Sequence, residues 1–85
     1  MNLTFSEKGW EQYLYWQATD KKMLDKLNIL IKDCLRSPFN GLGKPEALKG
    51  EFRGFWSRRI NDEHRLVYRV NDNAIEIVQC RYHYS

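Results

Sequence analysis

Hydrophobic residues recur with a helical period in the first half of the chain and with a strand period in the second half. Between Lys21 and Arg36 the apolar positions follow a period of 3.6 residues and predict one amphipathic helix, with Thr19 or Asp20 as its N-cap. The helix is predicted to end at Ser37, because Pro38 disfavours helical backbone in the residue before it. The stripe consists of Met23, Leu24, Leu27, Leu30, Ile31, Cys34 and Leu35, and Ile29 lies outside it as a candidate oligomer contact.

A shorter pattern precedes this helix. Residues 2–5 are predicted to form a first strand, and Ser6 is a suitable N-cap for a helix from about Glu7 to Gln17. Trp10 and Leu14 are spaced to share one face of that helix, and Gly9 is expected to weaken it.

After a loop around residues 40–45, three further strands are predicted at residues 52–60, 65–70 and 74–83. The intervening turns are short enough to join antiparallel neighbours. The expected fold class is therefore α+β, with residues 1–85 forming a single domain. In it, two N-terminal helices pack on one face of a mostly antiparallel four-stranded sheet.

The alternation along the last strands predicts which face carries which residues. A tight turn near Asp72 pairs odd-numbered residues with odd-numbered ones, and a bulge would shift that register. The even set is apolar and should face the helices: Leu66, Tyr68, Val70, Val78, Cys80 and Tyr82. The odd set becomes basic toward one end and should face outward: Arg65, Val67, Arg69, Gln79, Arg81 and His83. In the preceding strand Trp56 and Ile60 fit the apolar face, and Ser57 and Arg59 fit the basic one.

Charge and cysteine usage narrow the function classes. The formal charge is only +3, but basic residues gather between residues 44 and 60, which is typical of nucleic-acid binding. No stretch approaches the ~20 apolar residues of a membrane span, and nothing at the start fits a signal peptide. We therefore expect a cytoplasmic protein without membrane contact, with Cys34 and Cys80 as reduced core thiols. No metal-ligand spacing or phosphate-binding loop is present, so no metal and no cofactor are expected.

The candidate chemistry lies on the basic face. Arg59, Arg65 and Arg81 are suited to binding phosphates, although a solvated face paired with carboxylates is the alternative. A histidine can donate a proton at neutral pH, which makes His83 a candidate general acid. Glu46 lies among basic residues and is the candidate base, while His64 lies in a turn and is expected to be an ordinary hydrogen-bonded histidine.

Four motifs in order then resemble one family. They are GKPEALK at 43–49, GFWSRRI at 54–60, EHRLVY at 63–68 and CRYHY at 80–84. Together they resemble the YoeB family of the RelE/ParE toxin superfamily over essentially the whole chain. The resemblance implies a RelE-like fold and a toxin that cleaves mRNA in the ribosomal A site without a metal.

The resemblance also implies roles and partners. Glu46 would be the base and His83 the acid, and Arg65 would stabilise the phosphate transition state. Lys49 and Arg59 would assist, and Tyr84 would position the substrate. Arg81 remains a substrate-binding candidate from its predicted place on the basic face. The implied partners are mRNA, the ribosome, a YefM-like antitoxin and a second copy in a homodimer, with operator DNA reached only through the antitoxin complex.

Two alternatives remain open from the residues. A ParE-like, gyrase-directed toxin would use the same fold to bind a protein. A non-catalytic RNA-binding module would use the same basic face and would bind RNA in a salt-dependent way without cutting it.

Overall fold

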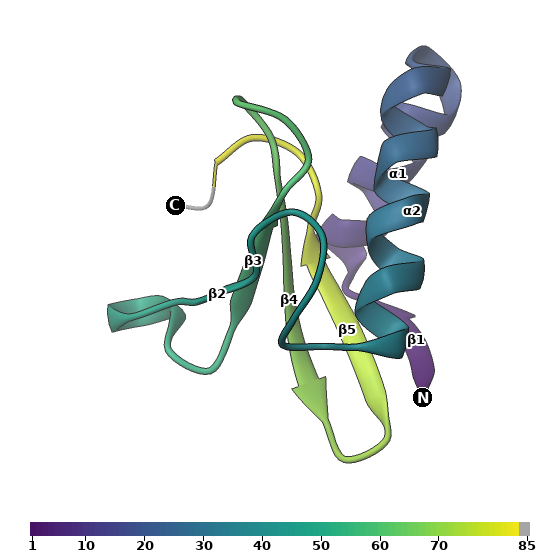
Figure 1. Ribbon diagram of the computed structural model, residues 1–85. Helices are drawn as coiled ribbons and strands as arrows, with labels where there is room; N and C mark the ends of the chain where they lie inside the picture. Colours follow the sequence, from purple (N-terminus) through teal and green to yellow (C-terminus); the bar gives the residue numbers. More distant parts are fainter. Residues whose placement is uncertain (84–85) are drawn as a thin grey trace.

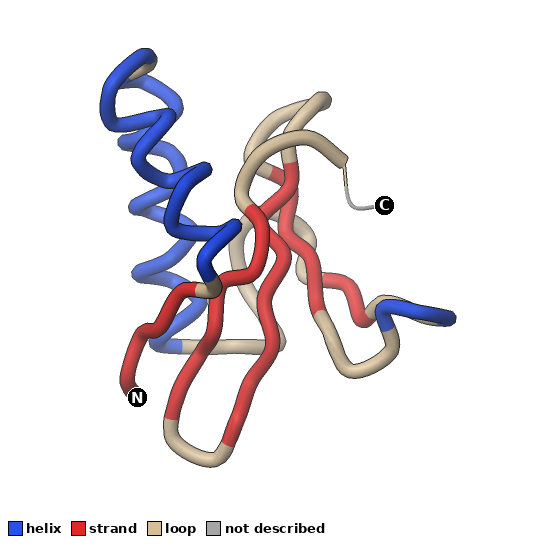
Figure 2. Tube along the Cα trace, turned by 180° about the vertical axis from the view of Figure 1, so that it is seen from behind, coloured by secondary structure: helices blue, strands red, loops and turns tan. Residues whose placement is uncertain are grey.

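The computed structural model describes residues 1–83. In chain order the elements are β1 (Asn2–Phe5), α1 (Glu7–Thr19), α2 (Lys21–Arg36), β2 (Glu46–Ala47), a 3-10 turn η1 (Gly50–Phe52), β3 (Trp56–Arg59), β4 (Arg65–Asn71) and β5 (Ala74–Gln79). Two helices lie side by side on one face of a sheet, and the other face is left open (Figures 1 and 2). The predicted α+β class is confirmed.

Both helices begin where their caps place them. The Ser6 hydroxyl accepts a hydrogen bond from the Gly9 N–H, and the Asp20 carboxylate accepts one from the Met23 N–H at 3.1 Å. In each helix the cap side chain thereby accepts from an amide N–H of the first turn, which has no backbone partner there. The predicted bounds of α2 are confirmed, and α1 extends two residues beyond the prediction. Ile29 is 57% exposed, as its place outside the apolar stripe indicated.

The sheet has five strands in the order β1-β5-β4-β3-β2, with β1 parallel to β5 and the other pairs antiparallel. The prediction of four strands was wrong because β2 is only two residues long. So short a strand leaves no alternating pattern in the sequence, and it forms only through its pairing with β3.

The strand predicted at residues 52–60 is also shorter than expected and spans only Trp56–Arg59. Gly50 and Gly54 have φ angles of +65° and +96°, which turn the chain before β3 begins. Such angles are readily adopted by glycine and interrupt an extended strand.

The last strand ends at Gln79, and the prediction that it continues to His83 was wrong. The Trp16 indole donates a hydrogen bond to the Cys80 carbonyl at 2.8 Å, and the Cys80 N–H donates one to the Gln12 side chain at 2.7 Å. These bonds to α1 replace pairing with a neighbouring strand. Residues 80–83 then cross to the side of the sheet away from the helices (Figures 1 and 2).

The register between β4 and β5 differs from the prediction. Tyr68 lies opposite Ile77 and Val70 opposite Ile75, so even positions of β4 face odd positions of β5. A bulge between Val67 and Tyr68 produces this shift. Ile75 and Ile77 therefore enter the core in place of Val78, and the prediction of Tyr82 as a core residue was also wrong, since it is 50% exposed.

The core lies between the helices and the sheet. Its buried members include Trp16, Leu27, Leu30, Ile31, Cys34, Ile60, Leu66, Tyr68, Ile75, Ile77 and Cys80. Both cysteines are free and buried, and burial raises the pKa of the Cys80 thiol to about 12. Within residues 1–83, no helix is long and apolar enough to cross a membrane, and no cluster of three or more metal-ligating side chains occurs.

Gly9 is needed where α1 crosses β5, although glycine is a poor helix former. A methyl group on Gly9 would overlap the Ile77 carbonyl oxygen, which accepts a hydrogen bond from the Ser6 N–H. We expect Gly9→Ala to lower the free energy of unfolding by about 1–3 kcal/mol, because this steric overlap outweighs the better helix propensity of alanine. Urea unfolding measures the change, with Gln17→Ala at an exposed position of α1 as the control. A Gly9→Ala variant as stable as the parent would contradict the close contact.

Candidate active site

On the open face of the sheet, strand pairing aligns the site residues in rows across the strands. Glu46 pairs with Ser57, Ser57 with Val67, and Val67 with Gln79, so these four residues form one row across β2, β3, β4 and β5. The next row brings Arg59 of β3 opposite Arg65 of β4. Cross-strand partners point to the same face, so a carboxylate and two guanidinium groups share this surface.

A groove of about 420 Å³ lies over these rows. It is lined by Lys44, Glu46, Ser57, Arg59, Arg65 and His83. Three basic side chains therefore surround one carboxylate and one imidazole. Such a composition suits an anionic ligand whose protons must be moved.

Arg65 is fixed at the edge of the groove by the turn that precedes β4. Its Nη1 donates hydrogen bonds to the carbonyl oxygens of Asn61 at 2.8 Å and His64 at 3.1 Å. These bonds use Nη1, so Nε and Nη2 can donate to an anion in the groove.

His83 reaches the groove through the segment that leaves β5. The backbone of this segment is tied to the sheet, because the Arg65 N–H donates to the Tyr82 carbonyl at 3.0 Å. The Gln79 side chain donates to the His83 carbonyl at 2.7 Å. An exposed residue close to the chain end is thereby held beside Arg65.

Not every predicted site residue lines the groove. Lys49 is exposed and borders a neighbouring hollow together with Glu46, Ala47 and Leu48. The Arg81 guanidinium lies 3.5 Å from the centre of the Tyr15 ring and 4.5 Å from that of Tyr82, outside the groove. Tyr84 lies outside the described residues.

Two lining residues were not among the predicted site residues. Lys44 appeared in the sequence only as a member of the basic cluster, and Ser57 only as a member of the outward face. Neither could be placed more closely, because Lys44 belongs to a loop and the pairing of Ser57 with Glu46 depends on the unpredicted strand β2.

A buried arginine holds the loop that leads into the groove. Arg58 is fully buried on the face of β3 opposite to Arg59, and it donates to the carbonyl oxygens of Ser37, Asn40 and Leu42. It also binds the Asp33 carboxylate at 2.7 Å. Hydrogen bonds from the Leu42 N–H, Arg58 and Arg36 lower the pKa of Asp33 to about 2, so this partner stays ionised.

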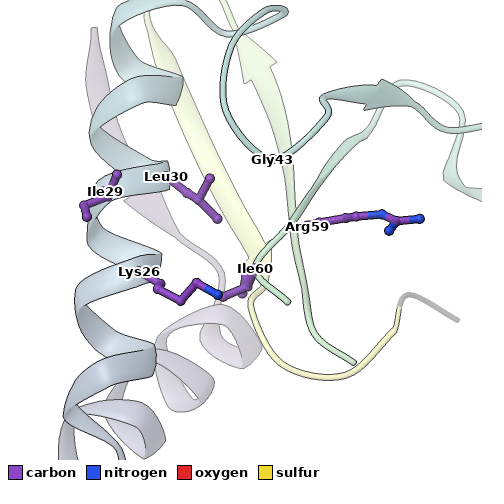
Figure 3. Close-up of a pocket in the computed structure, with 6 residues that line it drawn as sticks. All are labelled: Lys26, Ile29, Leu30, Gly43, Arg59 and Ile60. Carbon is purple, nitrogen blue, oxygen red and sulfur yellow. The ribbon is translucent and has the colours of Figure 1, made fainter. Parts of the chain in front are cut away.

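The far side of β3 borders a second, smaller hollow of about 270 Å³ (Figure 3). It is lined by Lys26, Ile29, Leu30, Gly43, Arg59 and Ile60. The Arg59 side chain points away from α2 there, toward the open face (Figure 3). Because this lining contains neither a carboxylate nor a histidine, it offers no acid–base pair.

Comparison with known proteins identifies the family of this chain. Residues 5–84 match the model of a family described as YoeB-like toxins of bacterial type II toxin-antitoxin systems. The chain belongs to this family. It is 60% identical to Toxin YoeB of Escherichia coli K12 over 84 residues, which cover 99% of this chain and all of that toxin.

Solved structures of YoeB toxins share the fold. A YoeB dimer from Staphylococcus aureus is 53% identical and superposes with a TM-score of 0.91, covering 99% of this chain and 98% of that one. A heterotetrameric YoeB–YefM toxin–antitoxin complex from the same organism gives a TM-score of 0.90 at 53% identity and the same coverage. The resemblance to YoeB toxins in the sequence is confirmed.

Proposed function

We propose that this toxin is a metal-independent endoribonuclease that cuts mRNA in the ribosomal A site and thereby inhibits translation. The observation that carries the proposal is the groove itself. Glu46 from β2 and His83 from the C-terminal segment line one hollow, together with the cations of Lys44, Arg59 and Arg65. These are the groups that cleavage of RNA by its own 2′-hydroxyl requires.

The reaction proceeds by proton transfer at two oxygens. Glu46 accepts the proton of the 2′-hydroxyl as that oxygen attacks the adjacent phosphorus. The new oxygen–phosphorus bond forms while the bond to the 5′-oxygen breaks, and the His83 imidazolium gives its proton to the leaving 5′-oxygen. The products are a cyclic phosphate and a free 5′-hydroxyl, so no water, metal or cofactor is consumed.

The cations act on the phosphate. Arg65 stabilises the charge that builds on the phosphoryl oxygens, since its position is fixed by the carbonyls of Asn61 and His64. Preorganised donors of this kind typically contribute about 10²–10³ in rate. We assign Arg59 and Lys49 to the RNA backbone on either side and Tyr84 to stacking on a base. Arg81 packs on Tyr15 and so orients the C-terminal segment.

The ribosome supplies the orientation of the RNA. Glu46, Arg59 and His83 are all exposed, and the groove is open, so free RNA would meet few groups that fix its conformation. An mRNA held in the A site already has its backbone ordered. Efficient cleavage of naked RNA would contradict this dependence.

The family relationship extends to partners. We propose that an antitoxin of the YefM kind covers the cationic groove and blocks the reaction, and that operator DNA is bound only through that complex. A second copy of the chain completes a homodimer in the cytoplasm, where the ribosomes are.

Primer extension on an mRNA in a translating extract tests the function. Added toxin is expected to produce new 5′ ends in frame with the A-site codons, and the His83→Gln variant is expected to produce far fewer of them in the same time. RNA binding without new ends would favour the non-catalytic module. Growth arrest with intact mRNA in cells would instead favour the gyrase-directed alternative.

A further inference from the structure

Two buried polar side chains hold the segment that carries His83. The Nδ1 atom of His64 accepts a hydrogen bond from the Tyr82 N–H at 2.7 Å. The Nε2 atom of Gln79 donates to the carbonyls of His83 at 2.7 Å and Arg81 at 3.1 Å. His64 and Gln79 are only 7% and 5% exposed. We refer to these two side chains and their bonds as the C-terminal clamp.

The segment needs such bonds because its backbone is strained. Tyr82 has a φ angle of +67°, which residues other than glycine rarely adopt. Beyond Gln79 the chain has also left the ladder of strand hydrogen bonds. One backbone bond, from the Arg65 N–H to the Tyr82 carbonyl, still ties the segment to β4. The rest of its hold comes from side chains: Gln12 of α1, which accepts from the Arg81 N–H at 3.1 Å, together with His64 and Gln79.

We propose that His64 and Gln79 are positioning residues that clamp His83 in the groove, and that the clamp holds only while His64 is uncharged. The inference rests on the proposed role of His83 as the proton donor. Displacing reacting groups by about 1 Å costs up to about 100-fold in rate, so the clamp acts on the cleavage step although neither side chain contacts the RNA.

The requirement for an uncharged His64 follows from the direction of its hydrogen bond. Nδ1 accepts from the Tyr82 N–H, so the ring proton of neutral His64 is on Nε2, which lies 3.5 Å from the Glu63 carboxylate. Protonation would place an N–H on both ring nitrogens. Two donors would then face each other at Tyr82, and the bond would be lost.

The surroundings of His64 favour its neutral form. Its ring packs edge-to-face on Trp16 at 4.8 Å between ring centres. Burial lowers the pKa of His64 below its ordinary value of 6.5, Glu63 opposes this, and the charges of Arg81, His83 and Arg65 reinforce it. Because the neutral form is favoured in the folded protein, the clamp is closed at neutral pH and opens as the pH falls below the lowered pKa of His64.

Three variants separate the parts of the clamp. In His64→Asn the amide oxygen keeps an acceptor near the position of Nδ1 and cannot titrate. In His64→Leu the apolar contact with Trp16 is kept and the acceptor is lost. Gln79→Met keeps the length of the side chain and removes its donors. Gln17→Met, at an exposed position of α1, is the matched control.

An NMR titration tests the clamp without any RNA. It uses the antitoxin-free chain with His83→Gln, which removes the second titrating ring of the segment and the proposed toxicity. The Tyr82 amide resonance is expected to change with the same midpoint as the His64 ring nitrogens, and to be independent of pH in the His64→Asn version. A Tyr82 amide that does not respond to the titration of His64 would overturn the proposal.

Cleavage of ribosome-bound mRNA, by chains that keep His83, tests whether the clamp affects the rate of the reaction. We expect His64→Leu and Gln79→Met to lower kcat up to about 100-fold with KM little changed. His64→Asn is expected to keep the parental kcat at neutral pH, and to lose less of its rate than the parent does when the pH is lowered. Equal kcat in all variants would overturn positioning. The two proposals fail separately: if the parent chain itself cuts no ribosome-bound mRNA while the Tyr82 amide still follows the titration of His64, the pH-sensitive clamp stands and the endonuclease function falls.

Discussion

Replacing His83 by glutamine is expected to lower the rate of mRNA cleavage on the ribosome by about 10²–10⁴-fold, and Glu46→Ala is expected to do the same. Each change removes one of the two proposed proton-transfer groups from a groove whose cations remain, and a well-placed general acid or base contributes about this much. Single-turnover cleavage of a programmed ribosome complex measures the chemical step directly. The affinity of the toxin for the ribosome should change little, since Lys44, Arg59 and Arg65 are retained.

A carboxylate outside the groove supplies the control. Glu51 is exposed and belongs to the 3-10 turn after β2, so Glu51→Ala removes the same charge from the same part of the chain without touching the groove lining. It should cut at the parental rate. If His83→Gln and Glu46→Ala also cut at that rate, their assignment as acid and base is wrong, whatever the fold.

Replacing Arg58 by methionine is expected to lower the free energy of unfolding by about 3–5 kcal/mol, as is typical when one partner of a buried ion pair is removed. The change leaves the buried Asp33 carboxylate, and three partly buried backbone carbonyls, without the donor that now serves them. Domains of this size have a total stability of only about 5–15 kcal/mol. Chemical denaturation of the purified variant, compared with the parent, measures the loss.

Arg53→Met is the matched control, because Arg53 is exposed and lies at the end of the 3-10 turn. It should change stability by less than about 0.5 kcal/mol. Arg58→Lys keeps the charge but not the planar fork that reaches several oxygens at once, so it should also be clearly destabilised. An Arg58→Met variant as stable as Arg53→Met would show that the buried network contributes nothing net.

The sequence determined the elements whose contacts are local. The bounds of α2 follow from the Asp20 cap, the apolar stripe and Pro38, all of which act within one or two helical turns. Alternation along β4 placed Leu66 and Tyr68 in the core. Arg59 and Arg65 were predicted on one outward face, and β3 and β4 place them opposite each other.

Only the tertiary structure decided the register between the strands and the point at which β5 ends. A bulge after Val67 moved Ile75 and Ile77 into the core, and β2 exists only because it pairs with β3. The end of β5 is set by Gln12 and Trp16, more than sixty residues earlier in the chain. No periodicity within a short window records contacts between residues so far apart.

The candidate site shows the same division. Residue types and motifs in the sequence pointed to Glu46 and His83 as candidate site residues, and to a basic face that carries them. Both residues line one groove because Arg58 holds the loop before β2, and because the side chains of Gln79 and His64 bind the backbone of the C-terminal segment. Charge and chemistry are properties of single residues and can be predicted from the sequence, whereas the distance between an acid and a base is set by side chains that take no part in the reaction.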